Sequence, residues 1–489
     1  MILLWLILIP LIAGVVSLLA ARRSAILPRW IALVGIAFDL VLTVTLWSTT
    51  PHSRWWYEFN ANWIPQLGIR CHLALDGLSL ALLLLTFFLG LMSVLASWTE
   101  VKDRVGFFHF NVLWVLAGIT GVFLAVDLFL FYLFWELMLV PMYFLIGIWG
   151  HGRKIYAAIK FFLFTQLSGL LMLAAILSLV VLHQQSTGVY TFDYEALINT
   201  PLSPNVARLL MLGFFAAFAV KLPVFPVHTW LPDAHSEAPT AGSVILAGLL
   251  LKTGAYGLIR FVLRLFPQSV HDLAPVMMTL GVIGVLYGAL MAVAQRDLKR
   301  LVAYTSVSHM GFVLIGIFAG NSIALTGAFI TMIAHGVSTG ALFVLAGALQ
   351  HRMHTREIER MGGLWQTMPA LSGAGLFFVM ASAGLPGLGD FVGEFLVLLG
   401  AFRANIGLTA AATLGIVAAT LYGLKISSQV FQGPNRQHWQ LPDLAPREWL
   451  IVGSMMAVLL WIGLYPQAFI HLFPTAPAQD TLAAFNRIR

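Results

Sequence analysis

Long apolar stretches separated by short polar connections run the length of this 489-residue chain. A stretch of about 18 or more apolar residues is long enough to cross the roughly 30 Å hydrocarbon core of a bilayer as an α-helix. The pattern predicts fourteen such helices, at residues 2–20, 30–48, 77–98, 107–126, 128–149, 156–183, 206–231, 239–264, 273–294, 301–319, 323–350, 368–402, 404–431 and 449–468.

Composition supports an all-α, polytopic membrane protein. Hydrophobic residues make up 60% of the chain and charged residues 10%, and the mean hydropathy is +0.90. The apolar stretches are too long for the strands of a transmembrane barrel. The net charge of +7 is spread over the connections, where it reports membrane topology and gives no indication of nucleic-acid binding.

Cofactor chemistry has no support in the sequence. Cys71 is the single cysteine, so the chain has no internal disulfide and cannot supply the thiolates of an iron–sulfur cluster. The fourteen histidines do not form a tight metal-binding spacing, and phosphate-binding glycine motifs are absent. We therefore expect no cofactor and no metal in this chain.

Basic residues distinguish the two sides of the membrane. Connections that follow odd-numbered predicted helices contain fifteen lysines and arginines, whereas the other connections and the C-terminal tail contain eight. Because positive residues favour the cytoplasmic side, both termini are expected outside. The remaining four basic residues fall within or at the edge of predicted helices, and they are Lys160, Lys221, Lys252 and Lys425.

Two predicted helices are interrupted by proline. In "FAVKLPVFPVHTWLPDAHSEAPTAGS", Pro223 and Pro226 follow Lys221, and in "ASAGLPGLGDFVGEFLVLL", Pro386 precedes Glu394. Such irregular backbone in a membrane is tolerated only within protein or beside a wet cavity. The two breaks lie five helices apart, an odd number, so a repeat with this offset is inverted, as in many transporters.

Ionisable residues recur within the apolar stretches, although each costs about 2.5–3.5 kcal/mol on insertion scales. They are Glu136, Lys221, Lys252, His309, His335 and Glu394. A nearby carboxylate stabilises the protonated form of a lysine, and the lysine loses its proton more easily when the carboxylate moves away. Histidine titrates near neutral pH. The set therefore predicts a proton relay, to which Lys160 is a possible addition.

Each residue also has a structural interpretation. Glu136 and Lys221 would then form a static ion pair, and Lys252 would extend to the interface. His309 would be an interfacial or hydrogen-bonded residue, and His335 would be satisfied by Ser338 and Thr339. Lys425 either joins the relay or extends to the interface.

A polar cluster follows the first break and consists of His228, Asp233, His235 and Glu237. Its spacing matches no established pattern of metal ligands, so helix capping and loop hydrogen bonding are the favoured interpretation.

Four motifs together resemble the antiporter-like subunits of respiratory complex I, and the M type most of all. They are "FWELMLVPMYFLIGIWG", "FAVKLPVFPVHTWLPDAHSEAPTAGSVILAGLLLKTGAYGLIR", "RDLKRLVAYTSVSHMGF" and "GLPGLGDFVGEF". The resemblance implies two inverted five-helix repeats, helices 4–8 (residues 107–268) and 9–13 (269–432), with helices 7 and 12 broken. Residues 1–106 would hold helices 1–3, and residues 433–489 helix 14 and the tail.

The resemblance also implies residue roles. Glu136 would pair with Lys221, Lys252 would be the central relay lysine, and His309 and His335 would continue the path to Glu394. A glutamate at that last position is what distinguishes the M type from the L and N types, which usually have lysine there.

As a consequence, the chain is expected to be a proton-translocating subunit of NADH–quinone oxidoreductase, driven by electron transfer elsewhere. FMN, iron–sulfur clusters and quinone would belong to partner subunits, and L- and N-type subunits would be its neighbours in a bacterial inner membrane. Subunits of multisubunit Na⁺/H⁺ antiporters and of membrane-bound hydrogenases share the resemblance, and they remain the alternatives.

Overall fold

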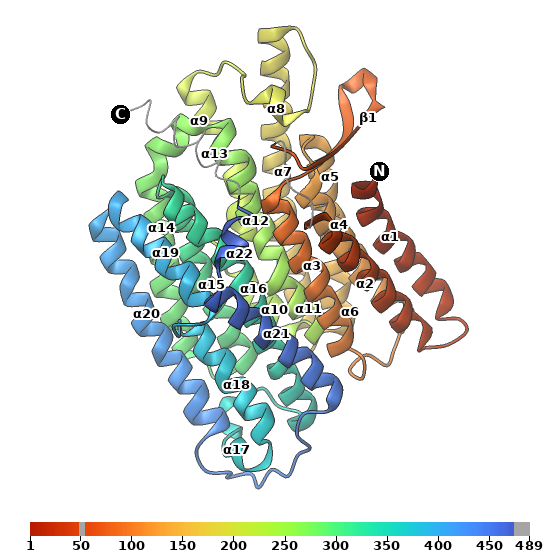
Figure 1. Ribbon diagram of the computed structural model, residues 1–489, viewed down its shortest axis with the longest axis vertical. Coiled ribbons are helices and arrows are strands. Elements are labelled where there is room, and N and C mark those ends of the chain that lie inside the picture. Colours follow the sequence, from red (N-terminus) through yellow and green to blue (C-terminus); the bar gives the residue numbers. More distant parts are fainter. Residues whose placement is uncertain (48–53, 474–489) are drawn as a thin grey trace.

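The computed structural model describes residues 1–47 and 54–473 as one bundle of near-parallel helices (Figure 1). Within these residues, thirteen helices are long and apolar enough to cross a membrane. Their bounds are Ile2–Ala20 (α1), Leu27–Trp47 (α2), Gly77–Ala96 (α3), Val105–Leu124 (α4), Leu128–Trp149 (α5 and α6), Lys154–Thr187 (α7), Pro204–Lys221 (α9), Thr240–Leu265 (α11 to α13), Pro267–Ala294 (α14), Leu298–Phe318 (α15), Ser322–Met353 (α16), Ile406–Phe431 (α20 and a π-helical end) and Pro446–Leu464 (α21).

The predicted helix at 368–402 is divided in two, as its proline and glycines indicated. Its halves are α18 (Pro369–Ser382) and α19 (Gly389–Ala404). Counted together as one passage, they complete the fourteen predicted crossings and confirm the all-α membrane fold.

Short elements occupy the connections and follow the first break. They are α8 (Tyr194–Leu197), α10 (Trp230–Glu237), α17 (Leu364–Thr367) and α22 (Gln467–Ile470), with 3₁₀ turns at Pro65–Leu67 and Ile358–Arg360. Three segments are wound as π-helix, at Leu246–Leu250, Leu258–Val262 and Ser427–Phe431.

A β-hairpin lies in a connection where the sequence predicted no regular element. Strands β1 (Tyr57–Ile64) and β2 (Ile69–Leu75) pair antiparallel, and Gly68 takes the left-handed conformation that the turn requires, with φ 62°. Mixed polar and apolar residues in so short a segment carry no helical period, and therefore the hydropathy pattern missed it. The hairpin projects from one end of the bundle, and α17 lies at the opposite end (Figure 1).

His72 ties this hairpin together and joins it to the connection between α7 and α9. Its Nδ1 lies 2.6 Å from Oδ2 of Asp193, and its Nε2 lies 2.8 Å from Oε1 of Glu58. Burial lowers the pKa of His72, but the hydrogen bonds and charges of the two carboxylates outweigh it and raise that pKa above its usual value.

Burial divides the helices into a central group and a peripheral group. The most apolar windows of α15, of α16 and of the Thr240–Leu265 helix are 100% buried, whereas those of α1, α2 and α21 are 33%, 28% and 28% buried. Small residues allow the central backbones to approach closely: a Cβ on Gly336 would lie 3.0 Å from the carbonyl oxygen of Gly248. Three of the predicted relay residues, Lys252, His309 and His335, lie on these central helices.

Candidate functional site

The break between α9 and α10 places Lys221 at the end of a half-helix. Pro223 and Pro226 follow within five residues and cannot donate backbone hydrogen bonds. The carbonyls left free at the end of α9 are satisfied locally: the indole of Trp230 donates to Val220 O at 2.9 Å, and Val224 N donates to the carbonyl of Ala219 at 2.8 Å. The break is therefore satisfied by local hydrogen bonds, and it is buried from Lys221 to Val224, whereas Pro226 and Thr229 are exposed.

Lys221 is buried with 1% exposure, and its ammonium has no hydrogen-bond partner among the described residues. The ammonium lies over two aromatic rings, 5.2 Å from the centroid of Trp135 and 5.6 Å from that of Phe161. Cation–π attraction thus replaces a direct ion pair here. The expected direct contact with Glu136 is not made, since the ammonium forms no hydrogen bond with any described residue, although the two charges attract each other.

Glu136 ends α5 (Leu128–Leu137) next to Trp135 and is partly exposed. The side chains of Tyr132 and Gln166 hydrogen-bond to its carboxylate. Gly169 of α7 makes room for this group, since a Cβ there would lie 2.6 Å from Oε1. The acid therefore lies at the edge of the bundle, whereas Lys221 is enclosed.

Lys252 and His335 form the first direct contact of the predicted relay. Both are fully buried, and Nζ of Lys252 lies 2.7 Å from Nδ1 of His335. The lysine also donates to the carbonyl of Ala247 at 2.5 Å. Ala247 belongs to the π-helical turn at Leu246–Leu250, a local irregularity that often occurs at functional sites.

His309 and Glu394 form the second direct contact. Nδ1 of His309 lies 2.5 Å from Oε1 of Glu394. Its Nε2 lies 3.0 Å from Oγ of Ser382 and 3.1 Å from Oη of Tyr422. Tyr422 also donates to the carbonyl of Ser382 at 3.1 Å, which satisfies a backbone group at the end of α18 where the helix is interrupted.

These two pairs lie side by side. The rings of His309 and His335 are 5.4 Å apart between centroids, and Nε2 of His335 has no hydrogen-bond partner in the part of the chain that the structure describes. Ser338 and Thr339 do not satisfy the His335 ring: Ser338 donates to an aspartate and to the carbonyl of His335, and the Thr339 hydroxyl has no hydrogen-bond partner among the described residues.

Sequence reasoning missed four residues of this region. Asp390 is completely buried and lies one helical turn before Glu394, a spacing that places both side chains on one face of α19. His235 is completely buried and interacts electrostatically with Lys252, although its sequence neighbourhood suggested capping. Tyr422 and Ser382 carried no signal in the sequence, because only the tertiary structure brings them to His309.

Lys160 takes part in an ion cluster away from the two pairs. Its Nζ lies 2.7 Å from Oδ2 of Asp233, whose other oxygen lies 2.7 Å from Arg300. This cluster joins α7, α10 and α15. Among the residues that the structure describes, no group of three or more histidine, cysteine or acidic side chains is arranged to hold a metal ion.

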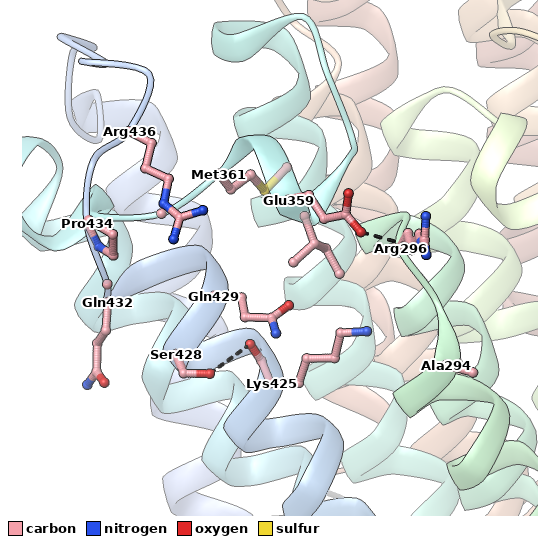
Figure 2. Close-up of a pocket in the computed structure, with 13 residues that line it drawn as sticks. Ala294, Arg296, Glu359, Met361, Lys425, Ser428, Gln429, Gln432, Pro434 and Arg436 are labelled. Atoms are coloured by element: carbon pink, nitrogen blue, oxygen red, sulfur yellow. Dashed lines mark hydrogen bonds and ion pairs between the residues drawn. The ribbon is translucent and has the colours of Figure 1, made fainter.

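Lys425 lies in a separate polar pocket of about 430 Å³, lined in part by Arg296, Glu359, Gln429 and Arg436 (Figure 2). Its ammonium donates to two carbonyls at the end of α14, those of residues 293 and 295, at 2.8 and 2.6 Å. The lysine thus caps a helix end, where a positive charge is favourable, and it contacts none of the relay residues.

Comparison with known proteins adds the family. Residues 125–421 match the family model described as NADH:quinone oxidoreductase/Mrp antiporter, TM. NADH-quinone oxidoreductase subunit M of Pseudomonas aeruginosa is 54% identical over 96% of both chains, and that of Escherichia coli K12 is 52% identical over 96% of both. The chain belongs to the M-subunit family of NADH-quinone oxidoreductase. Respiratory complex I from Thermus thermophilus contains a chain of the same fold, with a TM-score of 0.89, 33% identity and 99% coverage of each chain.

The part of this chain that matches the family model, residues 125–421, contains every predicted relay residue, from Glu136 to Glu394. The resemblance drawn from four motifs is thus confirmed over nearly the whole chain. The chain is an antiporter-like membrane subunit with buried charged residues, and Lys252, His309 and His335 lie on its most enclosed helices.

Proposed function

We propose that this M subunit moves protons across the membrane through Glu136, Lys221, Lys252, His335, His309 and Glu394. The observation that carries the proposal is the pair of direct contacts, Lys252 to His335 and His309 to Glu394, between four buried side chains. A bilayer interior excludes such groups unless they pair or conduct. Their side-by-side arrangement supports conduction, since an ion pair that only stabilises packing needs no neighbour of the same kind.

The remaining connections need small movements or water. Lys221 is not in contact with Glu136 but is attracted by it. Withdrawal of the carboxylate would release the lysine's proton, and the interruption of the helix directly after Lys221 leaves room for such a movement. Water bridging of enclosed polar groups is common in proteins.

Proton movement in this subunit needs an external drive. Each charge moved against the membrane potential costs about 2.3 kcal/mol per 100 mV, and the proposed residues store no such energy. We propose that electron transfer from NADH to quinone supplies it, with FMN, iron–sulfur clusters and quinone in partner subunits. The relatives' membership of NADH-quinone oxidoreductase supports this assignment.

The neighbours proposed for this chain are L- and N-type antiporter-like subunits in a bacterial inner membrane. The partly exposed Glu136 supports a covered surface at that edge of the bundle. The excess of basic residues in alternate connections supports an orientation with both termini outside.

The test replaces Lys252 with Met in the complete complex and reconstitutes it in liposomes. Protons moved per NADH oxidised are measured during quinone reduction. We expect the variant to assemble and to lose proton movement, because methionine fills the same volume but binds no proton. Lys425→Met is the matched control and should pump at the wild-type ratio. A Lys252→Met complex with the wild-type ratio would refute the proposed function.

A further inference from the structure

A gap separates the two pairs of the proposed relay. Both ring nitrogens of His309 are already engaged, Nδ1 by Glu394 and Nε2 by Ser382 and Tyr422. Nε2 of His335 has no hydrogen-bond partner within residues 1–47 and 54–473, and the two rings touch edge to face without a hydrogen bond between them. A proton therefore has no direct hydrogen-bonded path from the Lys252–His335 pair to the His309–Glu394 pair.

Asp390 is an acid of the same enclosed region. It is the second residue of α19, directly after the break. Gly389 brings this helix start close to α16, since a Cβ on Gly389 would lie 3.0 Å from Cβ of Ala334, the neighbour of His335. Asp390 thereby reaches Ser338, whose hydroxyl donates to Oδ1 at 2.9 Å.

The second oxygen of Asp390 has no partner. Asp390 is completely buried, and Oδ2 forms no hydrogen bond within the part of the chain that the structure describes. Leaving a buried carboxylate oxygen unpartnered is costly, and a single serine does not offset that cost. An oxygen of this kind is suited to binding a proton or a water molecule.

Charges from three helices act on Asp390. They come from Lys252 in the Thr240–Leu265 helix, from His309 in α15 and from Glu394 one turn further along α19. Tyr422 of α20 is also within electrostatic range. Asp390 supplies the attractive negative charge that acts on the buried Lys252. The acid thus interacts with Lys252 of the first pair and with both members of the second.

We propose that Asp390 is a proton-carrying residue that connects the Lys252–His335 pair with the His309–Glu394 pair. The inference rests on the proposed function. A proton leaves Nζ of Lys252, which breaks an N–H bond and leaves a neutral amine, and an O–H bond forms at Oδ2 of Asp390. That bond breaks in turn when the proton passes to the carboxylate of Glu394. Water molecules bridge the distances, and no electrons are exchanged.

A structural role makes a different prediction. Asp390 lies in the first turn of α19, where the helix dipole favours a negative side chain. Asparagine at the same position can accept the hydrogen bond from Ser338 and suits a helix start, but it binds no proton. Asp390→Asn is therefore nearly silent if the residue is structural and harmful if it carries a proton.

The experiment compares Asp390→Asn, Asp390→Glu and Asp39→Asn in the complete complex in liposomes. Asp39 of α2 is an equally buried aspartate outside the relay, so its variant controls for the loss of a buried carboxylate. We expect Asp390→Asn to lower the protons moved per NADH by about tenfold or more. Asp390→Glu should restore a substantial part, and Asp39→Asn should match the wild type.

Two results would overturn the proposal. One is a wild-type ratio in Asp390→Asn, and the other is an equal loss in Asp390→Asn and Asp390→Glu, which indicates a requirement for shape. If Lys252→Met fails to pump while Asp390→Asn pumps normally, Asp390 is not a carrier but the proposed function stands. If Lys252→Met also pumps normally, the proposed function itself fails.

A second variant keeps the test decisive if Asp390→Asn does not assemble. Ser338→Ala leaves the carboxylate in place and removes its one hydrogen bond. A proton carrier that has lost this bond should show a shifted pH profile of pumping, whereas an unchanged profile would count against the proposal.

Discussion

Replacing Glu394 with Gln removes the carboxylate from the contact between His309 and Glu394. Oε1 of Glu394 lies 2.5 Å from Nδ1 of His309, and both side chains are buried, at 7% and 3% exposure. A hydrogen bond that involves a charged group contributes about 1.5–3 kcal/mol. Glutamine keeps the shape of the side chain and can form a neutral hydrogen bond, but it loses the contribution of the charge. The stabilisation of the protonated pair should therefore fall by an amount within this range.

The lost hydrogen-bond energy affects the pumping rate if the proton must bind to this pair during transfer. If the transfer through His309 and Glu394 limits pumping, a barrier higher by about 1.5–3 kcal/mol slows it by about 10- to 150-fold. Glutamine also binds no proton, so the variant is expected at the slow end of this range.

The assay uses the complete Glu394→Gln complex in liposomes, with proton uptake and NADH oxidation recorded together. Reduction of a hydrophilic acceptor that takes electrons ahead of quinone should remain normal and report intact assembly. Glu359→Gln, at a residue 68% exposed beside Arg296, is the matched control. Wild-type proton uptake per NADH in Glu394→Gln would refute the assigned role of this pair.

Three further predictions concern stability and pH. Gly254→Ala places a Cβ 2.6 Å from a backbone oxygen of α9 and should destabilise the chain by about 1–3 kcal/mol, seen as a lower melting temperature, whereas Gly453→Ala, with open space around it, should not. Because the pKa of His72 is raised above its usual value of about 6.5, its contribution to the hairpin is complete below that pH and is lost as the pH rises through the folded-state pKa; hydrogen exchange of the hairpin amides should accelerate with that loss, and equal pH dependence in His72→Gln would contradict it. Asp76→Asn leaves the buried Arg260, 2.7 Å from Asp76, without its counter-charge and should cost about 3–5 kcal/mol; Arg260→Met added to it should restore thermal stability, and an unchanged melting temperature in Asp76→Asn alone would be the contrary result.

Much of the fold follows from hydropathy and proline positions. The fourteen passages were predictable because a helix needs about 18 apolar residues to cross a bilayer. This required length does not depend on how the helices pack against one another. The two breaks were predictable because proline cannot donate a backbone hydrogen bond. The hairpin was not, since two short amphipathic strands are stabilised by each other and by His72 rather than by a pattern within either strand.

The candidate site divides in the same way. A lone Lys252 or Glu394 within an apolar stretch is costly, so the sequence alone predicts that the residue is buried and has a function. Which buried group contacts which is decided by helix packing, because partners 83 and 85 residues apart meet only in the bundle. Nothing in the sequence around Tyr422 and Ser382 indicates a role in the site. Only the tertiary structure shows that both contact His309.

Lys221 shows the limit most clearly. The sequence determined that a lysine ends a half-helix within the membrane and that an acid, Glu136, lies in another helix. The tertiary structure decided that Trp135 and Phe161, rather than that acid, lie next to the ammonium. The physical reason is that insertion into a bilayer selects residues one helix at a time, whereas ion pairs and cation–π contacts depend on how neighbouring helices are rotated and spaced.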